Sequence, residues 1–304
     1  MSNAADQDSH PAPTRVSVVI AALNVVDVID VQLTALAEQE YDGDLEVVVG
    51  DNGSTDGLRA HLEGHPLREQ LGLRWVDASG ARGVSHARNV GVAAATGDFI
   101  AFCDADDRVD RLWLSILTEA ARQYDAVGGG LDAAALSSPR AVSWRPLSDI
   151  EKQPSSANAS LPWVGGGNMG IWRSVFQEVG GWDETYLYAL EDMEFSWRLQ
   201  LAGFSLGWRP KALISYRLRD DLRSLWRQSL NYGRGEVRLY RDYRGRCMTG
   251  RPVPYLILLI VLIIIRNPLL PTFLTRLPRG QWLWHVSALV GRIRGSLEYK
   301  VFYV

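Results

Sequence analysis

The sequence predicts an α/β protein built on a mostly parallel β-sheet with helices on both faces. Apolar, β-branched segments alternate with segments of helical periodicity through the first part of the chain. The first apolar segment, Arg15–Leu23, is continuous, as expected for a strand buried on both faces. Polar side chains follow three of the strands where each strand ends. Ligands of such sheets bind beyond the carboxyl ends of the strands, so we expect the site at this edge.

Four strands and four helices are expected before the alternation weakens. The predicted strands are 15–23, 45–50, 73–76 and 98–103. The predicted helices are 28–38, a helix that follows the turn-rich stretch ending at Gly57, 84–95 and 112–123. The polar residues at strand ends are Asn24 after the first strand, Asp51 after the second, and Asp104 to Asp107 after the fourth.

The second part of the chain is less regular. The expected elements are a short strand at 126–131, a polar loop at 137–160, a glycine-dense stretch at 163–172, a short helix at 174–178, a helix at 191–202, a final strand or pair of strands at 204–216, and a long arginine-rich helix at 220–243. The first 14 residues are polar and predict a disordered leader.

Composition limits the class of protein. The 304 residues contain two cysteines, which favours a reducing compartment over a disulfide framework. The net charge of −3 hides an asymmetry, because residues from Gly203 onward carry 18 Lys and Arg against 5 Asp and Glu. A basic C-terminal part indicates an anionic partner, or else a solvated arginine-rich helix. No nucleic-acid recognition module accompanies this charge, so we do not expect nucleic-acid binding.

The C-terminal region, residues 219–304, is predicted to associate with a membrane or to form an oligomer interface. Its apolar run, Val253–Ile265, is shorter than the ~20 residues needed to span a bilayer. A basic helix, a short apolar segment and the tryptophans Trp282 and Trp284 fit a protein lying on an anionic membrane surface. Burial of the apolar run in a homodimer is the alternative, and the two can coexist. We therefore expect a cytoplasmic protein, peripheral on the inner face of the cell membrane.

The stretch "FIAFCDADDR", Phe99–Arg108, ends an apolar run in three carboxylates. Neighbouring carboxylates repel one another unless a positive charge lies among them, and Mg²⁺ or Mn²⁺ prefers such oxygen ligands. Asp104 and Asp106 are two residues apart and can face the same side of the chain. Helix capping by Asp107 or Asp110 is the simpler alternative, but one cap does not need three acids.

An ordered set of motifs between about Val16 and Arg217 resembles the family 2 glycosyltransferases, whose nucleotide-sugar domain has the GT-A fold. The matching stretches are "VVIAALN" at Val18–Asn24, "GDNGSTDG" at Gly50–Gly57, "GVSHARNVGVAAATGDFIAFCDADD" at Gly83–Asp107, "GGGNMGIWRSVFQEVGGWDE" at Gly165–Glu184 and "EDMEFSWRL" at Glu191–Leu199. Each motif alone is weak, but their order and separation are specific. The resemblance implies a catalytic domain at 15–218, with a nucleotide-binding half at 15–110 and an acceptor half at 111–218.

The resemblance also implies roles for single residues. Asp51 corresponds to the acid that binds the nucleotide base, and Ala21 and Asn24 lie in the loop that covers the base. Arg88 corresponds to a basic residue near the nucleotide or its phosphates. Asp104 and Asp106 correspond to the DxD motif, in which the first acid contacts the ribose or the metal and the second binds the metal.

Further roles fall in the acceptor half. Asp192 corresponds to the catalytic base, and we expect the amides at its helix N-terminus to hold it ionised. Glu191 is expected to orient the acceptor or to pair with an arginine. The residues expected beside the donor sugar and the acceptor are Gly166, Gly167, Asn168, Trp182 and Glu191. Many relatives place a metal-binding histidine near the end of the final strand, but Ile214–Arg219 contains none. Two alternatives follow: a metal held by fewer protein ligands, or an arginine that replaces part of the charge role of the histidine.

The resemblance implies an inverting, metal-dependent transfer of a sugar from a nucleoside-diphosphate sugar to a hydroxyl group. UDP-sugars are favoured, with GDP- and dTDP-sugars as alternatives, and the candidate acceptors are a lipid-linked molecule or a cell-envelope glycan. A sugar-phosphate nucleotidyltransferase would need a glycine-rich loop after the first strand, where "AALNVVDVID" has no glycine. A non-catalytic scaffold on the membrane would be expected to lose the acidic site residues. All four are present: Asp51, Asp104, Asp106 and Asp192.

Overall fold

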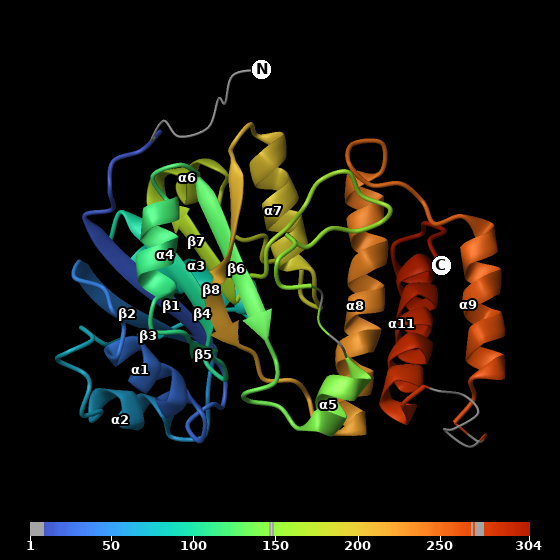
Figure 1. The fold of residues 1–304 in the computed structure, drawn as a ribbon, viewed down its shortest axis with the longest axis horizontal. Coiled ribbons are helices and arrows are strands. Elements are labelled where there is room, and N and C mark those ends of the chain that lie inside the picture. The colour runs from blue at the N-terminus through green and yellow to red at the C-terminus, as the bar shows by residue number, and fades with distance from the viewer. Residues whose placement is uncertain (1–8, 146, 148, 269, 271–276) are drawn as a thin grey trace.

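The computed structural model describes residues 9–145, 147, 149–268, 270 and 277–304. It contains an eight-stranded sheet, which lies beside a group of C-terminal helices (Figure 1). The strand order is β3-β2-β1-β4-β7-β6-β8-β5. The element labels follow Figure 1. The sheet is mixed but mostly parallel in its first half, as predicted for an α/β protein.

The first half of the sheet is parallel, with β1 (Arg15–Ala22) between β2 (Asp44–Asp51) and β4 (Phe99–Asp104), and β3 (Arg74–Asp77) at the edge. The helices between these strands are α1 (Ile29–Ala37), α2 (Leu58–Glu63) and α3 (Val84–Ala94), and α4 (Trp113–Ala120) follows β4 and the short strand β5. These elements lie within three residues of their predicted bounds. Their β-branched or periodic sequences therefore define them locally.

The second half of the sheet is mixed. Its strands are β5 (Arg108–Val109), β6 (Ala126–Asp132), β7 (Asn168–Trp172) and β8 (Leu206–Ser215). β7 runs antiparallel between β4 and β6, whereas β6 and β8 are parallel. The shorter helices α5 (Pro139–Trp144) and α6 (Arg173–Glu178) precede the helix α7 (Glu191–Leu201).

Three of these elements were not predicted: the strands β5 and β7 and the helix α5. Strand β7 lies in the glycine-dense stretch at 163–172, for which the sequence pattern predicts no strand. A Cβ atom at Gly170 would stand 2.5 Å from the ring of Phe99, so the glycine makes room for an aromatic side chain of β4. Glycine weakens a strand by itself, and here close packing against a neighbouring strand outweighs that preference.

The core of the sheet domain is rich in large aromatic side chains. Trp182 stacks on Phe195 with ring centroids 4.4 Å apart and contacts Phe102 edge to face at 5.4 Å. These three side chains come from β4, α7 and the turn before α7, and each is at most 2% exposed. Their packing fixes the start of α7 relative to the carboxyl end of β4.

The C-terminal helices are α8 (Leu222–Tyr243), α9 (Val253–Ile265) and α11 (Arg279–Glu298), and α8 and α11 lie side by side (Figure 1). A Cβ at Gly233 would overlap the Ala288 carbonyl, and one at Gly291 would overlap the Leu230 carbonyl. The two backbones can approach this closely because both positions are glycine. None of the helices in the described parts of the chain is both long and apolar enough to cross a bilayer.

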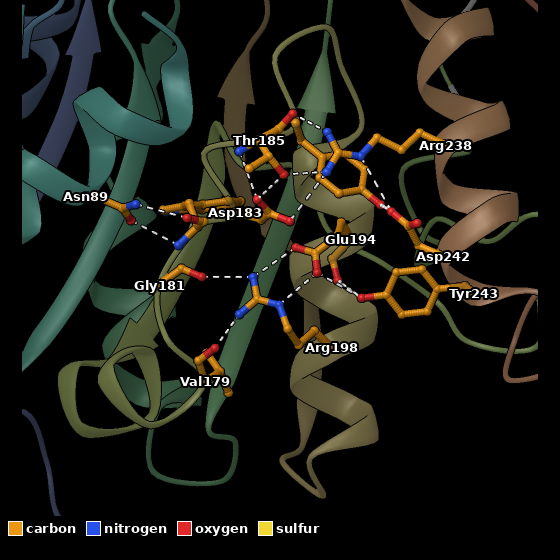
Figure 2. Close-up of polar contacts among 12 residues, drawn as sticks. Asn89, Val179, Gly181, Asp183, Thr185, Glu194, Arg198, Arg238, Asp242 and Tyr243 are labelled. Atoms are coloured by element: carbon orange, nitrogen blue, oxygen red, sulfur yellow. Dashed lines mark hydrogen bonds and ion pairs between the residues drawn. The ribbon is translucent and has the colours of Figure 1, made fainter. Parts of the chain in front are cut away.

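A network of ion pairs and hydrogen bonds joins α7 to α8 and to the turn before α7 (Figure 2). Glu194, buried on α7, binds Arg198 at 2.7 Å and accepts a hydrogen bond from the Tyr243 hydroxyl at 2.8 Å. Arg238 on α8 contacts Thr185 and lies 3.5 Å from Asp242. Since removing one partner leaves a buried charge unpaired, this network holds the helix that begins at Glu191 in place.

Three arginines of the predicted arginine-rich helix pair with carboxylates of the protein itself: Arg234, Arg238 and Arg241. Arg234 pairs with Glu298 at 2.5 Å, and Arg241 pairs with Asp242 at 2.7 Å. These charges, with Arg238, are neutralised within the protein. The exposed arginines of this helix and its end are Arg223, Arg227, Arg241, Arg244 and Arg246.

Candidate active site

Three predicted residues meet where strands β1, β2 and β4 end. In the strand register, Ala21 on β1 is paired with Asp104 on β4, and Ala22 is paired with Asp51 on β2. The parallel arrangement therefore brings carboxylates that are 53 residues apart in the chain to one edge of the sheet.

Asp51 is held firmly at this edge. One of its oxygens accepts a hydrogen bond from the Ser54 amide at 2.8 Å, and the other accepts from the Trp75 indole at 2.9 Å. Asn24, in the left-handed backbone region at φ 53°, accepts a hydrogen bond from the Thr55 amide at 2.8 Å. The loops that follow β1 and β2 are thereby joined, and each Asp51 oxygen keeps a free lone pair for a ligand.

Arg88 on α3 links two of the predicted acids. Its guanidinium group lies 3.0 Å from Asp104 and 3.2 Å from Glu191, and it stacks over the Trp182 ring at 4.9 Å. The Arg88 side chain is 4% exposed. Glu191 thus pairs with an arginine, one of its two expected roles. This buried cation connects the sheet edge to the start of α7.

The glycines that directly precede β7 allow this approach. A Cβ at Gly167 would overlap the Asp104 carboxylate, and one at Gly166 would lie 2.6 Å from the Arg88 guanidinium. Gly166 and Gly167 therefore lie against the charged groups of the site, where only glycine leaves enough space.

Two residues expected beside the donor sugar have buried side chains that do not face the open site. Asn168 is 1% exposed, and its amide group is used by the Gly130 and Ala212 carbonyls and by the Trp113 indole. Trp182 is 2% exposed and lies beneath Arg88, within the aromatic core. Both side chains support the site from behind, because the strand β7 and the turn before α7 direct them inward.

Asp106 and Asp107 differ in their surroundings. Asp106 lies 3.2 Å from the Arg219 guanidinium and is partly exposed, while burial and the charge of Asp104 raise its pKa. Asp107 is 1% exposed and accepts a hydrogen bond from the Arg217 amide at 2.8 Å. Burial raises the pKa of Asp107 well above its usual range. Asp107 therefore secures the chain after β8 and caps no helix.

The residues present fit a hard divalent cation. Asp104 and Asp106 supply two carboxylates with a mutual repulsion that a cation would relieve, and Mg²⁺ and Mn²⁺ take such oxygen ligands. Two protein ligands suit a metal that also binds the oxygens of a diphosphate. The segment after β8, where a metal-binding histidine would be expected, instead provides Arg219. The charge of Arg219 faces the same Asp106 carboxylate.

Asp192 lies at the second position of α7, after Leu190 in the left-handed region at φ 68°. Its carboxylate accepts hydrogen bonds from its neighbour's amide, Met193, at 2.8 Å and from the Gly166 amide at 3.4 Å. Burial and the charge of Glu191 nevertheless raise the pKa of Asp192 to about 7. The two amides favour the ionised form, as expected at a helix start, but burial and the charge of Glu191 outweigh them.

Asp192 and Glu191 open onto a cleft of about 370 Å³. Arg219 lines the same cleft, as do Arg227 and Tyr232 of α8. Sequence reasoning did not assign Arg227, Tyr232 or the Asp51 partner Trp75 to the site. No local pattern marks them, since they reach the site through long-range packing.

The chain belongs to glycosyl transferase family 2. The model of that family matches residues 17–180, more than half of the chain, and the model of glycosyl transferase family group 2 matches residues 99–291. The matched ranges include Asp51, Asp104, Asp106 and Asp192. The GT-A fold predicted from the motif order is confirmed by likeness to solved structures.

Among curated proteins, the chain is similar to the pre-mycofactocin glycosyltransferase of Mycobacterium tuberculosis, with 30% identity over 211 residues that cover 62% of this chain and 41% of that protein. It is also similar to the poly-β-1,6-N-acetyl-D-glucosamine synthase of Staphylococcus aureus, with 23% identity over 252 residues, or 80% of this chain and 60% of that one. The chain thus spans about 40 to 60% of the length of these relatives.

Two solved structures share the fold across nearly the whole chain. The mannosyltransferase PcManGT of Pyrobaculum calidifontis, in complex with GDP-Man and Mn²⁺, has a TM-score of 0.63 at 20% identity and covers 96% of this chain and 90% of its own. S. aureus TarS 1–349, in complex with UDP-GlcNAc, has a TM-score of 0.55 at 16% identity, with coverage of 95% and 93%.

Proposed function

We propose that this chain transfers a glycosyl group from a nucleoside-diphosphate sugar to an acceptor hydroxyl group, with inversion at the anomeric carbon. The observation that supports this most is the Arg88 bridge, which places the acids of the nucleotide-binding edge beside the start of α7. The proposed donor site and the candidate catalytic base, Asp192, are thus connected through one buried arginine. Relatives that carry UDP-GlcNAc or GDP-Man support this class of donor, with UDP-sugars favoured.

In the proposed reaction, Asp192 accepts the proton of the acceptor hydroxyl as its oxygen forms a bond to the anomeric carbon. The bond from that carbon to the diphosphate oxygen breaks, and its electron pair leaves with the nucleoside diphosphate. Mg²⁺ or Mn²⁺ bound to Asp106 and Asp104 would neutralise the charge that develops on the leaving group. Arg219 adds a second positive charge beside Asp106. Asp51 binds the nucleotide base of the donor, and Ala21 and Asn24 border that nucleotide base.

A panel of UDP-, GDP- and dTDP-sugars tests this proposal. We expect metal-stimulated release of the nucleoside diphosphate from at least one of them, with the sugar transferred to water when no acceptor is supplied. A protein that is stabilised against heat by none of these donors, with or without Mn²⁺, would refute the proposed donor class.

The pKa of Asp192 sets the expected pH dependence. Only the ionised carboxylate can take the acceptor proton, so activity should fall as the pH drops through about 7. We expect the transfer rate at a pH of about 6 to be roughly a tenth of its plateau. Glu191→Gln removes a repelling charge and should move the midpoint of the pH–rate profile to lower pH. A profile that is flat across this range would contradict the assignment of Asp192.

We further propose that the protein lies on the inner face of the cell membrane through α9. The side chains of Ile257, Ile264 and Ile265 are 57–65% exposed on this wholly apolar helix. Membrane anchoring would bury this surface and bring a lipid-linked or cell-envelope acceptor near the site. Deletion of 252–304 is a poor test, because it would also remove α11, which packs on α8.

Replacing these three isoleucines by serine should lower the fraction of protein that floats with phosphatidylglycerol vesicles at least about tenfold, since each isoleucine contributes up to ~3 kcal/mol when fully buried. Leu297→Ser, at a residue 77% exposed on α11, is the matched control and should float normally. Unchanged flotation of the triple variant, with a shift from dimer to monomer in sedimentation, would favour the homodimer instead.

A further inference from the structure

A second cavity, of about 380 Å³, adjoins the open cleft at Asp192. It is bounded by α7, α8, α9 and α11 and by the loop between α5 and β7. Asp192 and Tyr232 line both spaces, so the candidate base stands at their junction. The reaction described above assigns no role to this inner cavity.

The inner cavity carries an excess of positive charge. Three arginines line it, Arg145, Arg251 and Arg292, against the carboxylates of Glu236 and Asp192. His285 adds no charge, because burial and nearby arginines lower its pKa. Buried cations are normally balanced by anions, and here the balance is incomplete.

Two of the three arginines share a single oxygen atom. Glu236 Oε2 lies 2.9 Å from Arg251 and 2.7 Å from Arg292. Arg292 is 6% exposed, and its Nη1 is a buried nitrogen that has no hydrogen-bond partner among the described residues. An unsatisfied N–H on a buried guanidinium is costly, and a ligand oxygen would remove that cost.

Arg145 lines the cavity, and in the described parts of the chain its guanidinium faces tyrosine hydroxyls and no carboxylate. It donates hydrogen bonds to the hydroxyls of Tyr216 and Tyr232, both at 3.3 Å, and lies 5.1 Å from the centre of the Trp284 ring. Aromatic faces stabilise a cation but do not neutralise it. Its guanidinium therefore keeps donors and charge for an anion.

From these observations we infer that the inner cavity binds an anionic group, a phosphate or carboxylate, carried by the acceptor. This inference rests on the proposed transfer reaction and names the class of its acceptor. Arg145 and Arg292 hold the anionic group while the acceptor hydroxyl reaches Asp192. The arginine charge that serves the acceptor is therefore inside this cavity, rather than on the exposed face of α8.

Two neighbouring spaces offer room for the rest of such an acceptor. An apolar groove between α9 and α11 shares Tyr255 and His285 with the cavity and suits a hydrocarbon chain. A second space of about 360 Å³ shares Arg145, Trp163 and Trp284 with it and is lined by four tryptophans and several polar groups, which suits a sugar. The phosphate of either acceptor would bind in the inner cavity. A lipid chain would extend into the groove between α9 and α11, whereas a sugar would lie in the space lined by tryptophans.

Binding of phosphate compounds to the full-length protein tests the inference. Inorganic phosphate, dodecyl phosphate and glucose 6-phosphate would each be titrated calorimetrically at constant ionic strength in EDTA, which keeps metal from the donor site. We expect Arg292→Gln and Arg145→Gln each to weaken binding of the tightest compound at least about tenfold, as charge-assisted hydrogen bonds are lost. Arg294→Gln, at an exposed position of the same helix, should bind as the wild type does.

Tighter binding of dodecyl phosphate would support the site with a lipid acceptor, and tighter binding of glucose 6-phosphate would support it with a soluble one. Equal binding by both glutamine variants and the wild type would mean an adventitious ion only and would overturn the inference. Should Arg292→Gln fail to fold, Arg145→Gln decides alone, since it lies on a different element. Donor hydrolysis by the wild-type protein is measured separately, and its absence would refute the proposed function without deciding whether the cavity binds an anion.

Discussion

Replacement of Asp106 by alanine is expected to lower the rate of nucleoside-diphosphate release at least about 10³-fold. A bound metal contributes several kcal/mol to stabilising the leaving group, and each 1.4 kcal/mol is about a factor of ten in rate. Asp106 is the more exposed of the two acids after Asp104 and faces Arg219 rather than the core. Release would be measured by coupled detection of the nucleoside diphosphate across a Mn²⁺ titration.

Asp110→Asn is the matched control, since Asp110 is exposed in the same loop and an asparagine can still accept the hydrogen bond from the Leu112 amide. It should retain the wild-type rate. Wild-type release by the Asp106 variant at saturating Mn²⁺ would show that the metal is held elsewhere or is not required.

Replacement of Asp192 by asparagine is expected to leave donor binding intact and to lower transfer by about 10²- to 10⁴-fold, the usual contribution of a general base. Asparagine has nearly the same shape and can still accept the Met193 amide, so the start of α7 should not change. It cannot accept a proton. Single-turnover transfer and donor affinity would be measured on the same preparation.

Asp220→Asn, at an exposed aspartate before α8, controls for the loss of a carboxylate and should transfer normally. Transfer by the Asp192 variant within a few-fold of wild type would place the base at another residue. Loss of donor binding in that variant would instead mean that Asp192 supports the donor site and that its role in proton transfer is unproven.

The edge of the sheet where Asp51 and Asp104 meet could be predicted from the sequence because its signals are local. A continuous β-branched run predicts a buried parallel strand, and a polar residue directly after it must lie at the carboxyl edge of the sheet. Asp51 and Asp104 follow such runs, and the structure places both at this edge. The resemblance to a known family added roles to residues that the strand pattern had already grouped.

The parts that could not be predicted depend on packing between distant segments. Asn168 and Trp182 lie in motifs with expected contacts to sugar, yet strand pairing and the aromatic core turn their side chains inward. Arg292 follows Asp192 by 100 residues and reaches the cavity beside it only because glycines let α11 approach α8. No pattern within one segment could have indicated that contact.

The pKa of the Asp192 carboxyl group could not be predicted from the sequence for the same reason. Its position at a helix start is visible in the sequence and favours the ionised form. The opposing effects, burial and the neighbouring charge of Glu191, depend on how α7 packs in the folded protein. They raise the pKa to about 7, which suits a base that must accept a proton near neutral pH.

We propose that the carboxyl edge of β1, β2 and β4 binds a nucleoside diphosphate through a metal held by Asp104 and Asp106. Calorimetric titration of UDP, GDP and dTDP in Mn²⁺ and again in EDTA tests it most directly. We predict that at least one nucleotide binds in Mn²⁺ and that EDTA or Asp106→Ala weakens that binding at least about tenfold. Absence of binding by all three, or binding indifferent to both metal and Asp106, would contradict the claim.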